Sequence, residues 1–234
     1  VDMGAPGPDR GKGGKYLILP PGYDGDVPDG YFVSKSTSYI NWLILRGFLI
    51  DGKPDAASKM WRTGLKVYPL AMAENPPEMK YIDGSTVPFN TIHANDYEFY
   101  EELHTVLDRE PIDIVEPQLL GIAAAIGIQK GKPFEPDARM ESILEEAVAV
   151  GNATARAIWL KPRDQRAYFY ENSCWYTGFV GGDYQWFIEN GEGARNMDAR
   201  ALFFYSATVN TPAMAMKMVG VGSIRFPEIV CKSL

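Results

Sequence analysis

The chain of 234 residues is 46% hydrophobic, 12% aromatic and 23% charged, a composition typical of a globular protein rather than of a disordered or fibrous one. Its 23 Lys and Arg residues are outnumbered by 30 Asp and Glu residues, so the net charge is −7, which argues against nucleic-acid binding. No apolar stretch reaches the roughly 20 residues that cross a bilayer, and we therefore expect no membrane span.

Turn-forming residues divide the first third of the chain into short apolar segments. Residues 1–15 are rich in glycine, proline and charge, which predicts a flexible lead without the apolar centre of a signal peptide. The apolar runs at 15–19, 31–33 and 41–50 end at Gly, Pro and Asp residues, which predicts strands that pair antiparallel. Residues 54–65 predict a short helix. We expect residues 16–73 to be the β-rich part of a sandwich domain.

The apolar spacing becomes helical beyond a predicted linking loop at 74–92. Helices are predicted at 95–108, where Asn95 and Glu98 have the spacing of a capping box, and at 117–128, 137–151 and 198–209. Residues 161–192 predict irregular structure or short strands. We therefore expect a mainly helical subdomain at 93–218 and an atypical tail at 219–234. Strands first and helices later predict an α+β fold, a partial antiparallel β-sandwich followed by helices.

Few residues carry the usual signatures of catalysis. Two cysteines, Cys174 and Cys231, and two histidines, His93 and His104, are too few and too scattered for a zinc site, so we predict no metal and no cofactor. Two buried free thiols are favoured over a Cys174–Cys231 disulfide, and the redox state stays open. Phosphate-binding loops, a dinucleotide fingerprint and a serine nucleophile elbow are absent from the sequence.

Four segments of the chain resemble a known family. The segments are GKYLILPPG at 14–22, LRGFLIDG at 45–52, IQKGKPFEPDAR at 128–139, and the stretch from DAR at 198–200 to PAM at 212–214. Over residues 13–223 the chain resembles the bacterial proteins that contain the domain of unknown function 1254, which is usually followed by the domain of unknown function 1214. The resemblance implies β-sandwich units with a helical insert and, since many members carry export signals, a periplasmic or secreted full-length form. It also implies that this chain is a truncated fragment, because the opening strands are missing and residues 224–234 do not match.

Six residues match the family's motifs, and four of them form our candidate ligand site. Arg46, Lys132, Arg139 and Arg200 are predicted to converge on a carboxylate, sulfate or phosphate. Their structural interpretation is that Arg46 and Arg200 hold buried carbonyl or carboxylate groups and that Lys132 is exposed. The other two matching residues are Lys130 and Asp137, of which Asp137 is predicted to cap a helix.

The sequence supports three functional hypotheses. The first is a cofactor-free ligand-binding or structural module of the cell envelope, with a small anionic or glycan ligand. The alternative is a cofactor-independent hydrolase or lyase that acts on a small acidic or glycan-like substrate, because paired carboxylates need no fixed spacing. A third is a homo-oligomer that forms through unpaired strand edges. Whether the chain is an enzyme is left open.

Overall fold

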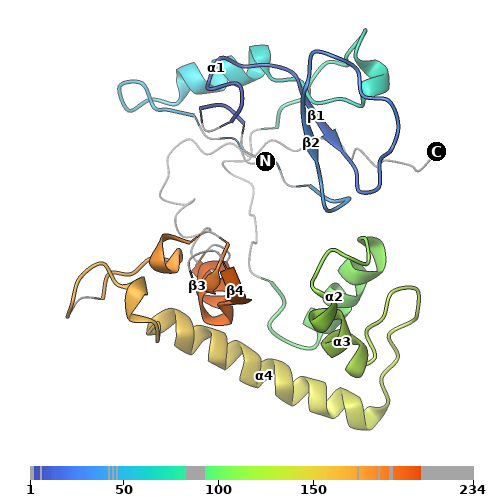
Figure 1. Cartoon of the computed structure of the whole chain (residues 1–234), viewed down its shortest axis with the longest axis vertical. Coiled ribbons are helices and arrows are strands. Elements are labelled where there is room, and N and C mark those ends of the chain that lie inside the picture. The colour runs from blue at the N-terminus through green and yellow to red at the C-terminus, as the bar shows by residue number, and fades with distance from the viewer. Residues whose placement is uncertain are drawn as a thin grey trace.

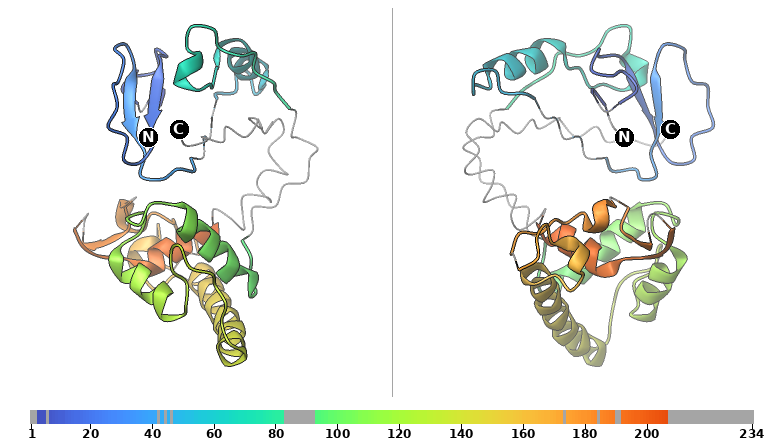
Figure 2. Two further views of the ribbon diagram at one scale, coloured as in Figure 1. Left: turned by 90° about the vertical axis from the view of Figure 1, so that its right-hand side faces the viewer. Right: turned by 60° about the vertical axis from the view of Figure 1, so that its left-hand side comes forward.

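The computed structural model shows a mixture of helices and short strands in two parts (Figure 1). The N-terminal part contains residues up to 82, and the mainly helical part begins at 93. The views from two further sides show the same two parts (Figure 2). This confirms the α+β fold class. The residues that the structure describes are 3–5, 7–41, 43, 45, 47–82, 93–172, 174–183, 185–189 and 192–206.

The N-terminal part contains one pair of strands. Strand β1 (Tyr16–Leu19) lies beside β2 (Phe32–Lys35), and the two run parallel, with Tyr16 opposite Phe32. The predicted antiparallel pairing is therefore wrong for these segments. The connection between them, about a dozen residues long, is long enough to bring the chain back to the beginning of β1, as parallel pairing requires. The described residues form no closed sandwich, since each sheet they contain has two strands.

The third predicted strand, at 41–50, is not formed by the described residues of that stretch. Only Ile50 pairs, in an isolated bridge with Lys53 across a tight turn. Asp51 and Gly52 at this turn have φ of 52° and 71°, a conformation that ends an extended segment. Phe48, which is 89% exposed, has no neighbouring strand to cover it. Residues 47–50, at the end of this apolar run, are therefore exposed instead of lying inside a sheet.

A helix follows the turn, as predicted. Helix α1 (Asp55–Gly64) lies within the expected range 54–65, and the short helix η1 (Leu70–Met72) comes after it. The Tyr81 hydroxyl donates to the carbonyl oxygens of Trp61 and Leu65 at 2.8 and 2.9 Å. The Trp61 carbonyl oxygen also accepts from the Leu65 backbone N–H, so the tyrosine hydroxyl gives the Leu65 carbonyl a partner at the C-terminal end of α1, where helices leave such groups unpaired.

The segment before β1 is organised around one buried carboxylate. Asp9 is 5% exposed and accepts hydrogen bonds from the backbone N–H groups of Gly4 and Gly13 and from the Tyr16 hydroxyl. These bonds hold the pKa of Asp9 below its usual value, with the Tyr16 hydroxyl as the largest cause. A segment that we expect to be a flexible lead thus contains a set of turns tied to β1.

The helical part begins with two helices. Helix α2 (Glu98–Arg109) and helix α3 (Pro117–Ala125) correspond to the predicted helices at 95–108 and 117–128. The predicted capping box at Asn95 is not formed: Asp96 accepts from the backbone N–H of Glu98 instead, at 3.1 Å. Asn95 donates to the carbonyl oxygen of His93, which occupies its side chain. Helix α2 consequently begins three residues later than expected.

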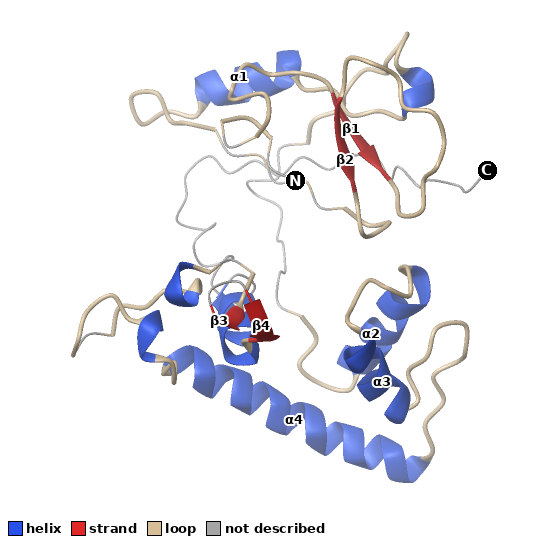
Figure 3. Ribbon diagram, viewed as in Figure 1, coloured by secondary structure: helices blue, strands red, loops and turns tan. Residues whose placement is uncertain are grey.

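Helix α4 (Ala138–Leu160) joins the two ends of the helical part (Figure 3). Its N-cap is Asp137, whose carboxylate accepts from the Met140 N–H at 2.8 Å, as predicted. The helix continues well beyond the predicted end at Gly151. In the first half, Leu144 is 2% exposed and packs in a core cluster with α2 and α3 residues. We call this the first cluster; its buried members are Tyr100, Leu107, Ala123, Ile128 and Leu144.

The C-terminal half of α4 packs against a second cluster. Residues 165–195 form two short helices, η2 (Gln165–Ala167) and η3 (Val180–Gly182), and the antiparallel strands β3 (Phe187–Glu189) and β4 (Glu192–Arg195). Short strands and irregular structure are what the sequence predicts here. Residues 197–206 are helical, inside the predicted range 198–209, whose last residues lie outside the described part of the chain. The buried members of the second cluster are Ala167, Val180, Ala199 and Leu202.

One buried carboxylate connects the N-terminal part to the helical part. Glu110, 3% exposed at the end of α2, accepts from the backbone N–H groups of Tyr39 and Ile40 at 2.7 and 3.1 Å. The Lys130 ammonium donates to the carbonyl oxygens of Asp108 and Glu110, which fastens the same end of α2 to the loop after α3. None of the helices in the described residues is long and apolar enough to cross a membrane.

Candidate functional site

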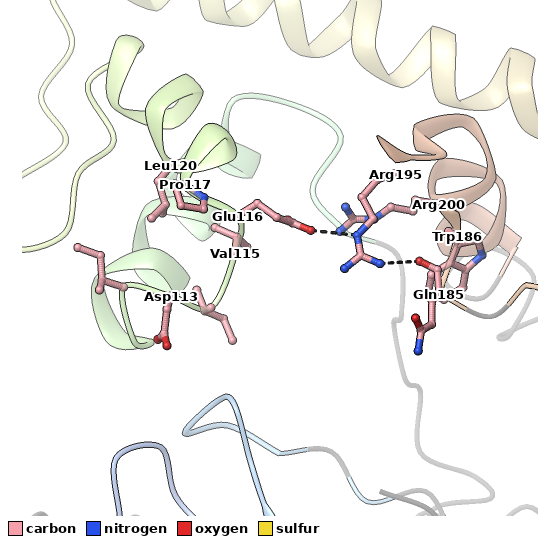
Figure 4. Close-up of a pocket in the computed structure, with 11 residues that line it drawn as sticks. Asp113, Val115, Glu116, Pro117, Leu120, Gln185, Trp186, Arg195 and Arg200 are labelled. Atoms are coloured by element: carbon pink, nitrogen blue, oxygen red, sulfur yellow. Dashed lines mark hydrogen bonds and ion pairs between the residues drawn. The ribbon is translucent and has the colours of Figure 1, made fainter. Parts of the chain in front are cut away.

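A cavity of about 920 Å³ lies between two walls of the helical part (Figure 4). That volume falls in the range of small-molecule pockets. One wall is the loop between α2 and α3, and the other contains the β3–β4 segment and the helix at 197–206. Most of the lining is aliphatic or aromatic, with four charged side chains. The lining residues are Ile112, Asp113, Ile114, Val115, Glu116, Pro117, Leu120, Gln185, Trp186, Arg195 and Arg200.

The first wall is held by the beginning of α3. Pro117 occupies the first turn of the helix, where its missing N–H and its fixed φ are favourable, so the preceding Glu116 stands at the N-cap. Ile114, Val115 and Leu120 pack against the first cluster. Apolar packing thus fixes the backbone of this loop, and the Glu116 side chain extends toward the opposite wall (Figure 4).

The second wall is positioned by Asp183 and Trp186. The Asp183 carboxylate accepts from the backbone N–H groups of Gln185 and Phe187, both at 2.7 Å, and these bonds lower the pKa of Asp183. Trp186 donates from Nε1 to the Gly178 carbonyl oxygen at 3.1 Å and packs against the second cluster. The indole is therefore fixed in direction where it lines the cavity.

An ion pair joins the two walls. Arg195 Nε lies 3.1 Å from Glu116 Oε1, and Arg195 Nη1 donates to the Gln185 carbonyl oxygen at 2.9 Å. The pKa of Glu116 is lowered, first by its own backbone N–H and then by the Arg195 hydrogen bond, with Arg200 also contributing. Glu116 is therefore a carboxylate at neutral pH. Its side chain is 44% exposed, so the pair contributes only about 0–1 kcal/mol to stability.

Arg200 is the second cation at this junction. It extends from the helix at 197–206 toward the Glu116–Arg195 pair (Figure 4), and its backbone N–H donates to the Asn196 carbonyl oxygen. Among the described residues, the Arg200 guanidinium has no hydrogen-bond or ion-pair partner. It is partly buried, beside apolar lining. A planar fork of donors in such surroundings is suited to bind a carboxylate or a phosphate.

The structure separates the predicted site residues. Arg200 lines the cavity, near the end of α4 that carries the second cluster. Arg139 is exposed at the opposite end of α4, about 30 Å away by the rise of the helix. Lys132 precedes that same end and donates to the Gln129 side chain at 2.7 Å. Arg46 lies outside the described residues. Arg200 is thus not brought together with Arg139 or Lys132.

The remaining cavity residues were not candidates from the sequence. Asp113, Trp186 and Arg195 have no motif spacing, and they meet only because α4 carries both clusters. The Glu116-Pro117 pair is a recognisable beginning of a helix, a signal that locates Glu116 but not its partner across the cavity.

Two other residues with reactive side chains, Cys174 and His104, lie outside the cavity. Cys174 is a free thiol and is exposed, so the prediction that it is buried is wrong, while Cys231 lies outside the described residues. His104 Nε2 is 2.8 Å from the Lys132 carbonyl oxygen, which ties α2 to the loop before α4. Within the part of the chain that the structure describes, no three His, Cys, Asp or Glu residues are grouped as a metal site.

Comparison with known families assigns a match to the N-terminal part of the chain. Residues 3–69 match the model of a family described as a protein of unknown function, DUF1254. The predicted resemblance is thereby confirmed over residues 3–69, and beyond residue 69 it stays a prediction. The DUF1254 match covers β1, β2 and α1, and the cavity lies beyond it, between residues 112 and 200. No curated protein matches the chain.

Proposed function

We propose that this chain is a ligand-binding module that holds a small organic anion in the cavity between α3 and the β3–β4 segment. The observation that carries the proposal is Arg200, a guanidinium without a partner among the described residues, beside a mostly apolar lining. A ligand carboxylate would bind Arg200 in bidentate fashion, and its hydrocarbon part would cover Trp186 and the aliphatic residues of the first wall.

The Glu116–Arg195 pair supports the same reading. The pair occupies the Arg195 guanidinium, so Arg200 is the guanidinium of the lining that a ligand carboxylate would bind. The lowered pKa of Glu116 also makes it a poor proton donor near neutral pH. Glu116 is therefore unsuited to the general-acid role in the alternative, a cofactor-independent hydrolase or lyase, and we favour binding.

The first test is titration of the chain with 3-phenylpropionate, a carboxylate with an apolar ring, followed by calorimetry. We expect saturable binding, and we expect Arg200→Gln to weaken it about tenfold or more, since a hydrogen bond to a charged group is worth roughly 1.5–3 kcal/mol. Arg156→Gln, which changes an exposed arginine on α4 outside the cavity, is the matched control. Equal affinity of Arg200→Gln and the unchanged chain would overturn the proposal.

The remaining expectations concern location and assembly. We propose a periplasmic or secreted location for the full-length form, supported by the export signals that the DUF1254 resemblance implies. Cell fractionation would test it.

We also propose self-association through the open edges of the β1–β2 pair, where backbone groups lack a neighbouring strand among the described residues. Sedimentation at several concentrations tests this, and a strict monomer would remove it.

A further inference from the structure

We infer that the ligand of this cavity is a linear zwitterion, with a carboxylate at one end, an ammonium at the other and an apolar segment between them. An apolar short peptide or an ω-amino acid belongs to this class. The inference rests on the proposed function, because it takes Arg200 as the carboxylate-binding group, and it adds a second recognition group, Asp113.

The charges of the lining carry this inference. The cavity has two cations, Arg195 and Arg200, and two anions, Asp113 and Glu116. Arg195 and Glu116 neutralise each other in the ion pair across the cavity. Within the described residues, neither Arg200 nor Asp113 has a side-chain hydrogen bond or an ion pair, and Arg200 acts on Glu116 through longer-range attraction alone. A cavity lining with one unpaired charge of each sign is complementary to a ligand that also carries one charge of each sign.

The positions of these two residues determine the arrangement of the ligand. Asp113 lies on the loop between α2 and α3, and Arg200 lies on the opposite wall (Figure 4). Val115 and Leu120 line the first wall, and Trp186 lines the second. The two charges of the ligand therefore have to be separated by an apolar spacer. A plain carboxylate would satisfy Arg200 but would leave its far end near the uncompensated Asp113 carboxylate.

The experiment compares matched linear ligands by calorimetry on the full chain. The set is hexanoate, hexylamine and 6-aminohexanoate, with longer and shorter ω-amino carboxylates to vary the spacing of the charges. We expect 6-aminohexanoate or a neighbour in the series to bind about threefold to tenfold more tightly than the carboxylate of the same length, since Asp113 is exposed and its attraction is partly screened. Added salt should reduce this preference.

Variants assign the preference to its residue. Asp113→Asn should remove the advantage of the ω-amino carboxylate while leaving hexanoate affinity unchanged or slightly higher. Glu146→Gln, an exposed acidic change on α4, is the matched control and should leave the preference intact. Arg200→Gln should weaken hexanoate and 6-aminohexanoate alike.

The outcomes distinguish this inference from the function on which it rests. Arg200-dependent binding of hexanoate without any gain from the amino group would overturn the zwitterion and leave anion binding in place. No binding by any carboxylate or zwitterion would overturn both. Binding of hexylamine alone, lost in Asp113→Asn, would also overturn both, because the site would then prefer cations to carboxylates.

Discussion

Single carboxylates organise several parts of this chain, and each does so by accepting backbone N–H groups. Asp9 binds Gly4 and Gly13, and Asp183 holds the turn that presents Gln185 to the cavity. In each case a short acidic side chain replaces hydrogen bonds that a regular element would supply. The sequence reveals such residues poorly, since acidic residues next to glycine are also common in mobile segments.

Replacement of Asp9 should change the pH dependence of stability. Its pKa is lowered in the folded chain, so its contribution is present above the usual value of 3.8 and is lost as pH falls below that value through the folded pKa. We expect Asp9→Asn to lower the melting temperature at pH 7 and to reduce the further loss between pH 5 and pH 3. Thermal melts at these pH values measure both effects.

The exposed change Asp24→Asn serves as the control for Asp9→Asn. It should melt like the unchanged chain at every pH. Equal loss of stability on acidification in Asp9→Asn and in the unchanged chain would show that Asp9 does not anchor the segment before β1.

At the scale of elements, the positions of the helices and of strands β1 and β2 were predictable, and the pairing of the strands was not. Helices α1, α3 and α4 lie where the apolar spacing and the cap residues predict them, because those signals are local. Strand pairing depends on a partner far away in the sequence. For this reason the direction of β2 relative to β1 was missed, and so was the lack of a partner strand for residues 47–50.

The N-cap of α4 offers a quantitative test at this scale. Asp137→Ala removes the acceptor of the Met140 N–H, and we expect it to lower the free energy of unfolding by about 0.5–2 kcal/mol. Asp137→Ser retains a capping oxygen and should lose only a small part of that amount. Urea denaturation of the two variants measures the difference. A serine variant as unstable as the alanine variant would show that capping is not the cause.

For the whole molecule, the decisive feature is how few polar contacts connect its two parts. Glu110 provides both side-chain hydrogen bonds that we find from the described helical residues to the described N-terminal ones. Its role has no sequence signal, since Tyr39 and Ile40 are distant in the chain. The candidate site was predictable only in part. Arg200 belongs to a family motif, whereas Asp113, Trp186 and Arg195 come together only in the tertiary structure.

Replacement of Glu110 should loosen the connection between the parts. In Glu110→Gln one acceptor oxygen becomes an N–H donor that faces a backbone N–H, and an unsatisfied buried group costs about 1–3 kcal/mol. We expect amide exchange at Tyr39 and Ile40 to accelerate about tenfold or more. Hydrogen-exchange mass spectrometry measures this, with the exposed change Glu102→Gln as control. Unchanged exchange at both amides would contradict the proposed connection.

Helix α4 sets the distance between the two walls of the cavity. Each wall packs against a cluster that α4 contacts. The first cluster includes Leu144 of α4 and is contacted by Met140 and Val148, and the second is contacted by Ile158 and Trp159. Val148 and Ile158 are roughly 15 Å apart along the axis, so a straight helix fixes the spacing of the two clusters and with it the width of the cavity. Gly151 lies between them, with open space where a Cβ would be. A small bend at this glycine, where a helix is weakest, would open or narrow the cavity as a lever does, without repacking either cluster.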